Sequence, residues 1–103
     1  MKKIYKYRLD PAVDPETQPM IFMPKGAKIL HFNTQQVAGL GSAIFMWAEV
    51  DTQQEDEART FYILMTGQKI PEFEHATLYY LDTVHLRDIG IVAHIYEFKL
   101  TQK

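Results

Sequence analysis

The sequence predicts an all-β fold, in which seven strands form a single-domain sandwich or flattened barrel. Turn-forming residues recur about every ten to fifteen positions, and the runs between them are rich in β-branched and aromatic side chains. Several runs also alternate polar and apolar residues, as strands with one buried face do. A chain of 103 residues is long enough for one hydrophobic core. We therefore expect one β-rich domain over residues 1–103.

The first two strands are expected on either side of a proline-rich connection. Residues 3–9 alternate, with two tyrosines and Leu9 on one face and Lys6 and Arg8 on the other. The following DPAVDPE segment contains two Asp-Pro pairs, which disfavour both a helix and a central strand. Residues 18–23 carry or adjoin prolines at both ends, which predicts an edge strand or an irregular extended segment.

The next segment predicts a tight turn, a strand and a flexible connection. The tripeptide PKG at residues 24–26 is typical of a type II turn, in which glycine adopts a positive φ. A strand is expected over residues 27–32. The segment VAGLGSA, residues 37–43, has two glycines and is expected to be a flexible connection.

The most apolar run is AIFMWAEV, residues 43–50. It predicts a central strand buried on both faces, with a helix as the open alternative, because periodicity does not distinguish the two in a short apolar run. In the acidic segment that follows, Thr52 and Glu55 match a capping box. At most one short helical turn is therefore expected within residues 51–59.

The last three runs, residues 60–66, 77–86 and 91–100, have the composition of strands. Asp88 and Gly90 lie between the last two of them and predict a tight hairpin.

Composition excludes several classes of protein. The chain has no cysteine, so disulfides and thiolate metal sites are excluded. Its net charge of −2 gives no general attraction for nucleic acid. No apolar run approaches the roughly 18 residues of a membrane span, and Lys6 and Arg8 interrupt the N-terminal run that an export signal would need. We expect a cytoplasmic protein without a membrane segment or a cofactor.

Residues for catalysis are sparse. Ser42 is the only serine, and it lacks the Gly-x-Ser-x-Gly setting of a hydrolase nucleophile. The isolated strand acids, Glu49, Asp82 and Glu97, are expected to point outward as ordinary surface charges. The sequence therefore favours a protein that is not an enzyme.

Anion binding is the sharpest functional hypothesis. Two glycine turns carry lysine, and the amides of such turns form concave sites for anions. The candidate ligand-binding residues are Lys25, Gly26, Lys28, Thr66, Gly67 and Lys69. Neither turn matches a phosphate-binding P-loop. A joint site requires both turns to lie at the same end of the fold.

A metal site is not expected from histidine spacing, with one geometric exception. If the last hairpin has a two-residue loop, His85 and His94 stand opposite each other, about 5 Å apart at Cβ. If the loop has three residues and a bulge, which Asp-x-Gly favours, the two histidines point to opposite faces.

Nucleic-acid binding would use the basic face of the first strand, formed by Lys2, Lys6 and Arg8. Such binding also needs aromatic side chains beside the cations, on which the bases stack. Tyr5 and Tyr7 alternate away from the basic residues, so nucleic acid is not expected as a partner.

Five stretches of the sequence run in order through almost the whole chain: KKIYKYRL, IFMPKGAKILHF, FMWAEVD, RTFYILMTGQKIP and LYYLDTVHLRDIGIVAHIYEF. Together they resemble a family of small proteins from tailed bacteriophages and prophages with a domain of unknown function. The resemblance implies a phage origin and an infected bacterial cytoplasm, without an activity. Members carry a Gly-Thr-Gly-His-like turn where this chain has Met65 and Gln68, so no role of that histidine transfers.

Self-association is expected, with a dimer favoured. The segment Met20, Ile21, Phe22 and Met23 forms a candidate apolar interface. The leading functional hypothesis is a non-enzymatic phage accessory protein, as in counter-defence. It would bind a host protein or sequester a small signalling molecule, phosphorylated ones included. The alternatives are a phage structural or tail-associated component and a small phosphate-handling enzyme.

Overall fold

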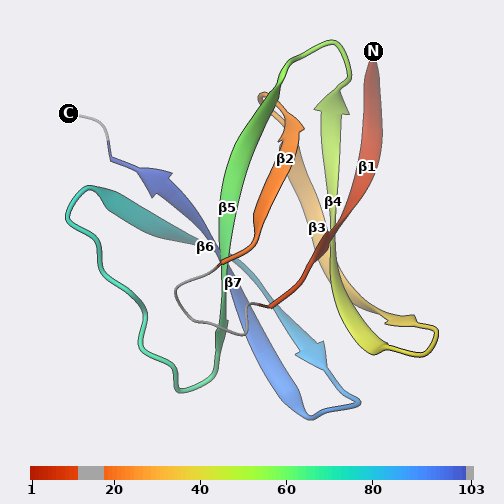
Figure 1. Ribbon diagram of the computed structural model, residues 1–103, viewed down its shortest axis with the longest axis vertical. Helices are drawn as coiled ribbons and strands as arrows, with labels where there is room; N and C mark the ends of the chain where they lie inside the picture. The colour runs from red at the N-terminus through yellow and green to blue at the C-terminus, as the bar shows by residue number, and fades with distance from the viewer. Residues whose placement is uncertain (12–17, 102–103) are drawn as a thin grey trace.

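The computed structural model describes residues 1–11 and 18–101, and this part of the chain is all-β (Figure 1). Most of the predicted DPAVDPE connection lies outside the described residues. The strands are β1 (Lys2–Leu9), β2 (Met20–Pro24), β3 (Lys28–Val37), β4 (Gly41–Asp51), β5 (Asp56–Met65), β6 (Ala76–Leu86) and β7 (Ile91–Leu100).

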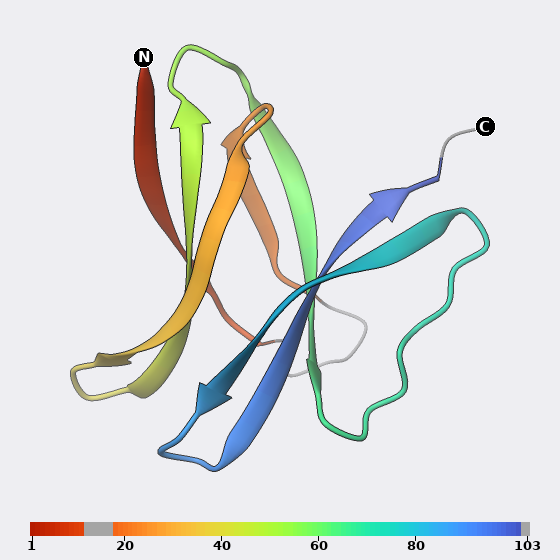
Figure 2. The same cartoon turned by 180° about the vertical axis from the view of Figure 1, so that it is seen from behind.

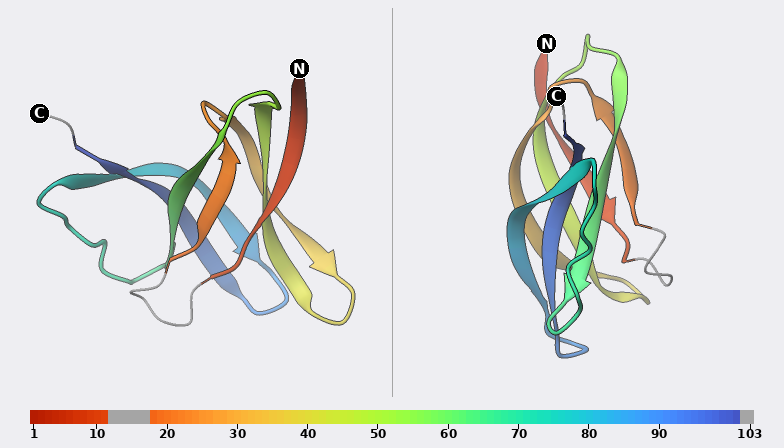
Figure 3. Two further views of the ribbon diagram at one scale, coloured as in Figure 1. Left: turned by 45° about the horizontal axis from the view of Figure 1, so that its top comes forward. Right: turned by 90° about the vertical axis from the view of Figure 1, so that its left-hand side faces the viewer.

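The strands form two antiparallel sheets, with orders β1-β4-β3 and β2-β5-β7-β6. The sheets face each other in a flattened body that measures 39 × 37 × 19 Å (Figure 3). From behind, β3 and β6, which are edge strands of different sheets, lie in front (Figure 2). The predicted seven-stranded sandwich is therefore confirmed.

The AIFMWAEV run is a strand, β4, and it lies in the middle of its sheet. Ile44 and Met46 are fully buried, whereas Phe45 and Trp47 are only half-buried. This alternation places one face of β4 on the core and the other on the molecular surface. The helix alternative is wrong, and so is the expectation that both faces are buried.

The core lies between the two sheets. Its largest fully buried side chains come from five different strands: Phe61, Leu9, Met23, Ile44, Met46, Ile95 and Val50. Burying a large apolar side chain contributes about 1.5–3 kcal/mol, so these contacts hold the sheets together. No helix in the described residues is long and apolar enough to cross a membrane.

Two strand boundaries differ from the sequence-based expectation by four or more residues. β3 was expected to end at Phe32, but it extends to Val37. Its second half pairs with β4, and the last pair is Val37 with Gly41. The predicted flexible connection is thus mostly strand, with a short turn at residues 38–40. β5 likewise begins at Asp56, where it pairs with β2.

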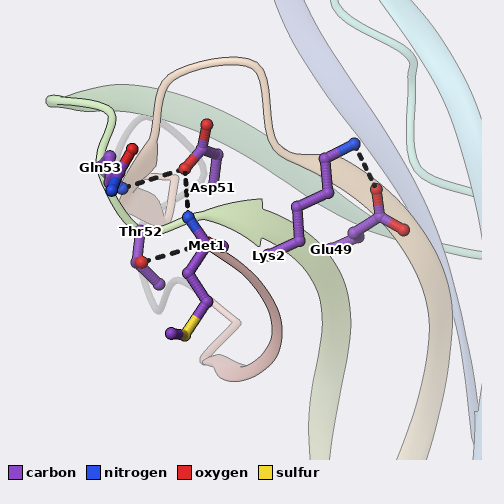
Figure 4. A network of polar contacts seen from close by, with 6 residues as sticks. All are labelled: Met1, Lys2, Glu49, Asp51, Thr52 and Gln53. Carbon is purple, nitrogen blue, oxygen red and sulfur yellow. Dashed lines mark hydrogen bonds and ion pairs between the residues drawn. The ribbon is translucent and has the colours of Figure 1, made fainter.

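The β4–β5 connection contains a turn and no helix. The Thr52 hydroxyl donates to the carbonyl of Met1 at 3.1 Å, so it does not cap a helix (Figure 4). Asp51 Oδ1 accepts hydrogen bonds from the amide of Gln53 at 3.1 Å and from the N-terminal ammonium at 3.3 Å. The hydrogen bond from the Gln53 amide makes the largest contribution to lowering the pKa of Asp51, and the N-terminal ammonium lowers it further. These contacts fasten the N-terminus to the β4–β5 turn.

β5 changes partner along its length. Its first half pairs with β2, and its second half, from Thr60 opposite Phe98 onward, pairs with β7. Before Thr60, β5 and β7 diverge, which Figure 1 shows as a fork at the top of the four-stranded sheet. One end of the sheet is consequently open between these two strands.

Candidate functional site

The two glycine turns lie at opposite ends of β5. The first turn, residues 24–27, connects β2 to β3 beside the start of β5, because Pro24 pairs with Asp56. The second turn, residues 65–68, follows the end of β5, at the bottom of Figure 1. A ten-residue strand spans about 30 Å. The joint anion site is therefore not formed, and each turn is considered on its own.

The first turn already holds an anion. Gly26 has φ 81°, and a 3.1 Å hydrogen bond between residues 27 and 24 closes the turn, as predicted for type II. The amide of Gly26 donates to Glu57 Oε2 at 3.1 Å, and the amide of Lys25 donates to the carbonyl of Glu55 at 2.8 Å. A carboxylate from β5 thus occupies the position that a phosphate would need.

The second turn also has a glycine at positive φ, but a different side chain bonds to its backbone. Gly67 has φ 95°, and the Gln68 amide donates to the Met65 carbonyl at 3.1 Å. The Gln68 side chain folds back, and its Oε1 accepts from the Met65 amide at 2.7 Å. Among the described residues, none bonds to the Gly67 amide or to the Lys69 ammonium. This turn therefore keeps a free donor and has no carboxylate of its own.

A chain of hydrogen bonds leads to the second turn across the outer face of the four-stranded sheet. The Thr66 hydroxyl lies 2.9 Å from His94 Nε2, and the Thr83 hydroxyl lies 3.0 Å from His94 Nδ1. Tyr80 extends the chain, with its hydroxyl 2.6 Å from the Thr83 hydroxyl. The arrangement follows from register, since Thr83 on β6 is directly opposite His94 on β7. Both ring nitrogens are engaged, which fixes the orientation of the imidazole.

A hollow of about 240 Å³ lies beside this chain and is called the turn hollow below. Its lining combines apolar side chains with the polar groups of the turn: Leu64, Met65, Thr66, Gly67, Gln68, Ile70, His94 and Tyr96. Lys69 is exposed and does not line it, although its two chain neighbours do.

Aromatic side chains hold the β5–β6 loop on the sheet next to the turn hollow. Phe73 from the loop packs edge-on against Phe98, with ring centroids 5.2 Å apart, and against Tyr62 at 5.8 Å. Tyr96 contacts Tyr80 at 5.5 Å. Such pairs contribute about 0.5–1.5 kcal/mol each beyond area burial. The loop that carries the second turn is thereby anchored to the sheet.

The last hairpin has a four-residue loop, so neither expected histidine arrangement is correct. Leu86 pairs with Ile91, which places His85 opposite Val92 and His94 opposite Thr83. Both histidines lie on the same face, as diagonal neighbours and not as a direct pair. Within the described residues, no group of three or more histidine or acidic side chains is arranged to hold a metal ion.

The sequence-based interpretation missed a buried ion pair. Arg59 binds Glu97 with two hydrogen bonds, from Nε at 2.6 Å and from Nη2 at 2.8 Å, and its Nη1 donates to the carbonyl of Ala27 at 2.6 Å. Glu97 is 4% exposed, so its expected outward orientation is wrong. Its β7 neighbours Ala93 and Ile95 are buried on the same face, and that alternation was the available signal. The hydrogen bonds to Glu97 raise the pKa of Arg59, and burial of the guanidinium, which lowers it, offsets only part of this effect.

The other two strand acids are ordinary surface groups. Glu49 lies 3.7 Å from the Lys2 ammonium, and Asp82 accepts a hydrogen bond from the amide of Thr83.

Neither of the two larger hollows is lined by a glycine amide that lacks a hydrogen-bond partner. One, of about 560 Å³, lies in the fork between β5 and β7, where Arg59 and Glu97 satisfy each other and Glu57 is bound to Gly26. The other, of about 540 Å³, lies between the β3 and β6 edges. There the Thr34 hydroxyl donates to a β6 carbonyl at 3.2 Å. The turn hollow is thus the best candidate site.

The predicted apolar interface on β2 is divided by strand alternation. Met20 and Phe22 are 55% and 64% exposed, whereas Met23 is fully buried and Ile21 packs against the core. Only Met20 and Phe22 are available at the surface.

A protein-family model described as "Domain of unknown function (DUF7352)" matches residues 1–103, the whole chain. No curated protein and no solved structure matches the chain.

Proposed function

The chain belongs to the DUF7352 family, a domain of unknown function. We propose that it is a non-enzymatic binding protein for a small anionic ligand. The ligand's anionic group, a phosphate or a carboxylate, binds in the turn hollow. Thr66, Gly67 and His94 form the binding site, and Lys69 adds positive charge nearby.

The observation that carries the proposal is the chain from Tyr80 to Thr66. Its donors can align in one direction, with Tyr80 donating to Thr83, Thr83 to His94 Nδ1, and His94 Nε2–H to the Thr66 oxygen. The Thr66 hydroxyl hydrogen is then free to donate into the hollow. Hydrogen bonds in such chains polarise one another, which strengthens the last donor toward an anion.

The first turn supports the same chemistry by example. There the glycine amide of a type II turn donates to a carboxylate at 3.1 Å within the molecule itself. Gly67 occupies the equivalent position in the second turn, with φ 95° against 81° for Gly26. Because no carboxylate among the described residues bonds to Gly67, its amide is available to an external anion.

The size of the turn hollow limits how much of the ligand it encloses. Sites for drug-sized molecules have volumes of roughly 300–1,000 Å³, and this hollow has about 240 Å³. The hollow therefore encloses the anionic group, and the rest of the ligand lies over the apolar rim formed by Ile70 and Tyr96.

The cellular role is part of the proposal. The sequence resemblance to tailed-phage proteins supports an accessory protein that works in the cytoplasm of an infected bacterium. Sequestration of a small phosphorylated signalling molecule fits an anion site without catalytic groups. Exposed Met20 and Phe22 on the edge strand β2 support a further contact, with a second copy of the chain or with a host protein.

Isothermal titration calorimetry with inorganic phosphate and with phenyl phosphate tests the proposal. Thr66→Val removes the hydroxyl and keeps the shape, and we expect it to weaken binding roughly 10- to 100-fold, the worth of one hydrogen bond to a charged group. Thr77→Val is the matched control, since Thr77 is an exposed strand threonine outside the three hollows. Absence of binding to both probes, or equal binding by Thr66→Val, contradicts the proposal.

A further inference from the structure

The outer face of the three-stranded sheet carries two rows of side chains with an aromatic residue in the middle of each. In the first row, Trp47 on β4 stands between Lys6 on β1 and His31 on β3. In the second, Phe45 stands between Arg8 and Asn33. The rows are adjacent, because Phe45 and Trp47 are two residues apart on one strand face. We call these two rows the aromatic platform.

The side chains of the aromatic platform contact one another. The rings of Phe45 and Trp47 have centroids 6.4 Å apart, and His31 lies 5.9 Å from Trp47 and is tilted by 36° to it. The Lys6 ammonium lies 4.2 Å from the centroid of Phe45 and 5.6 Å from that of Trp47. A cation is therefore held directly above a pair of half-buried rings.

Lys6 retains its positive charge for a ligand. Its ammonium donates to Gln35 Oε1 at 2.5 Å, and this partner is neutral. Arg8 is instead paired with Asp10 at 2.7 Å, which offsets part of its charge.

The sequence alone did not reveal this platform, because the aromatic and basic residues come from different strands. Tyr5 and Tyr7 share β1 with Lys6, and alternation places them on the other face, where Tyr7 packs against the core. The rings beside Lys6 belong to β4. The pairing of β1 with β4, which sets Lys6 opposite Trp47 and Arg8 opposite Phe45, brings the two kinds of side chain together.

We infer that the aromatic platform binds single-stranded nucleic acid. Bases stack on Phe45 and Trp47, and backbone phosphates contact Lys6 and Arg8, the combination that sequence-tolerant single-strand binding uses. A duplex is excluded as the preferred ligand, because the faces of its bases are already stacked on each other. A second copy packed here by a two-fold axis would place Lys6 and Arg8 against like charges, which disfavours self-association through this face.

Trp47 provides a direct readout, because it is the only tryptophan in the chain. The experiment is a titration of the protein with oligothymidylate at low salt, monitored by tryptophan fluorescence. We expect saturable quenching that weakens with salt, with a log–log slope of about −1.4 for two phosphate contacts. Inorganic phosphate at equal ionic strength should not quench, because it has no base to stack.

Variants assign the binding to the platform. Phe45→Ala should weaken it roughly 5- to 150-fold, the value of one stacked base. Lys6→Gln alters an exposed side chain, so it should leave the fold intact and reduce the slope to about −0.7. Lys25→Gln, at the first turn, is the matched charge control and should change nothing beyond a small electrostatic effect. Thr66→Val should also bind normally, which separates this inference from the turn hollow.

Three results would overturn the inference. The first is an absence of quenching, and the second is equal affinity for duplex and single strands. The third is a sedimentation coefficient of the free protein that changes with protein concentration in the wild type and not in Lys6→Gln. That result would identify the platform as a contact between copies of the chain.

Discussion

The two glycine turns at the ends of β5 share a backbone conformation and differ in what satisfies them. Gly26 at the first turn donates to the carboxylate of Glu57, whereas the second turn is closed by the neutral side chain of Gln68. The first turn is therefore an anion site that the protein fills itself. The second keeps a free glycine amide next to the hydroxyl of Thr66 and the oriented imidazole of His94. A turn motif indicates a binding site only where no internal group completes it.

The largest expected effect concerns the ion pair that holds the first turn. Arg59→Met removes the donor to Ala27 and leaves the buried Glu97 carboxylate unpaired, so we expect a loss of about 3–5 kcal/mol in the free energy of unfolding. Urea denaturation measures it. The double replacement Arg59→Met with Glu97→Leu should recover most of the loss, because it leaves no buried charge. A double variant as unstable as the single one would contradict this explanation.

The two glycines should have equal structural roles and unequal functional ones. Gly26→Ala and Gly67→Ala each force a residue with Cβ to a positive φ, at a cost of about 1–2 kcal/mol. An added Cβ meets no atom within 4 Å at either position, so no clash adds to this cost. Thermal unfolding should give similar losses for both variants, and phosphate binding should weaken only for Gly67→Ala. Weaker binding in Gly26→Ala alone would reverse the assignment.

Removal of Glu57 should make the first turn resemble the second. Glu57→Ala frees the amide of Gly26, which directly follows Lys25 and precedes Lys28 by two residues in the sequence. We expect the free energy of unfolding to fall by only about 1 kcal/mol, since the lost hydrogen bond is at the surface. The variant should gain weak phosphate binding that is visible as a shift of the Gly26 amide resonance. A variant that binds no phosphate at Gly26 would show that the turn geometry alone is insufficient.

The smallest effect concerns a second carboxylate that is bound by a backbone amide. Asp88 in the β6–β7 loop accepts from the Ser42 amide at 2.9 Å, and the hydroxyl and amide of Ser42 lower the pKa of Asp88. A lowered folded-state pKa gives stability that is present above the unfolded value, near 4, and is lost as pH falls through the folded value. Asp88→Asn should therefore be slightly less stable than wild type at pH 7 and equal to it at low pH. A difference that persists at pH 2 would contradict this origin.

The sequence predicted the fold class well, because turn residues and alternation are local signals. The same alternation, applied along residues 91–100, places Glu97 on one face with Ala93 and Ile95, and that face is buried in the core. The end of β3 was missed because its second half, which includes Gln35 and Gln36, is polar and depends on pairing with β4.

The candidate site was only partly predictable. Thr66 and Gly67 were identified from the turn motif, and the positive φ of Gly67 confirms the turn geometry. His94 and Thr83 could not be assigned to the same site, because their contact depends on a four-residue hairpin loop that shifts the register. One residue of register decides which side chains stand opposite each other. That information lies in the tertiary structure and not in the motif.

The most direct test of the account is an NMR titration of the ¹⁵N-labelled wild-type protein with phenyl phosphate. We predict saturable shifts of the Thr66 and Gly67 amides and of the His94 ring, with no shift at Gly26, where Glu57 already occupies the turn. Shifts confined to Gly26, or no saturable shift at Gly67, would contradict the claim that the second turn is the open anion site.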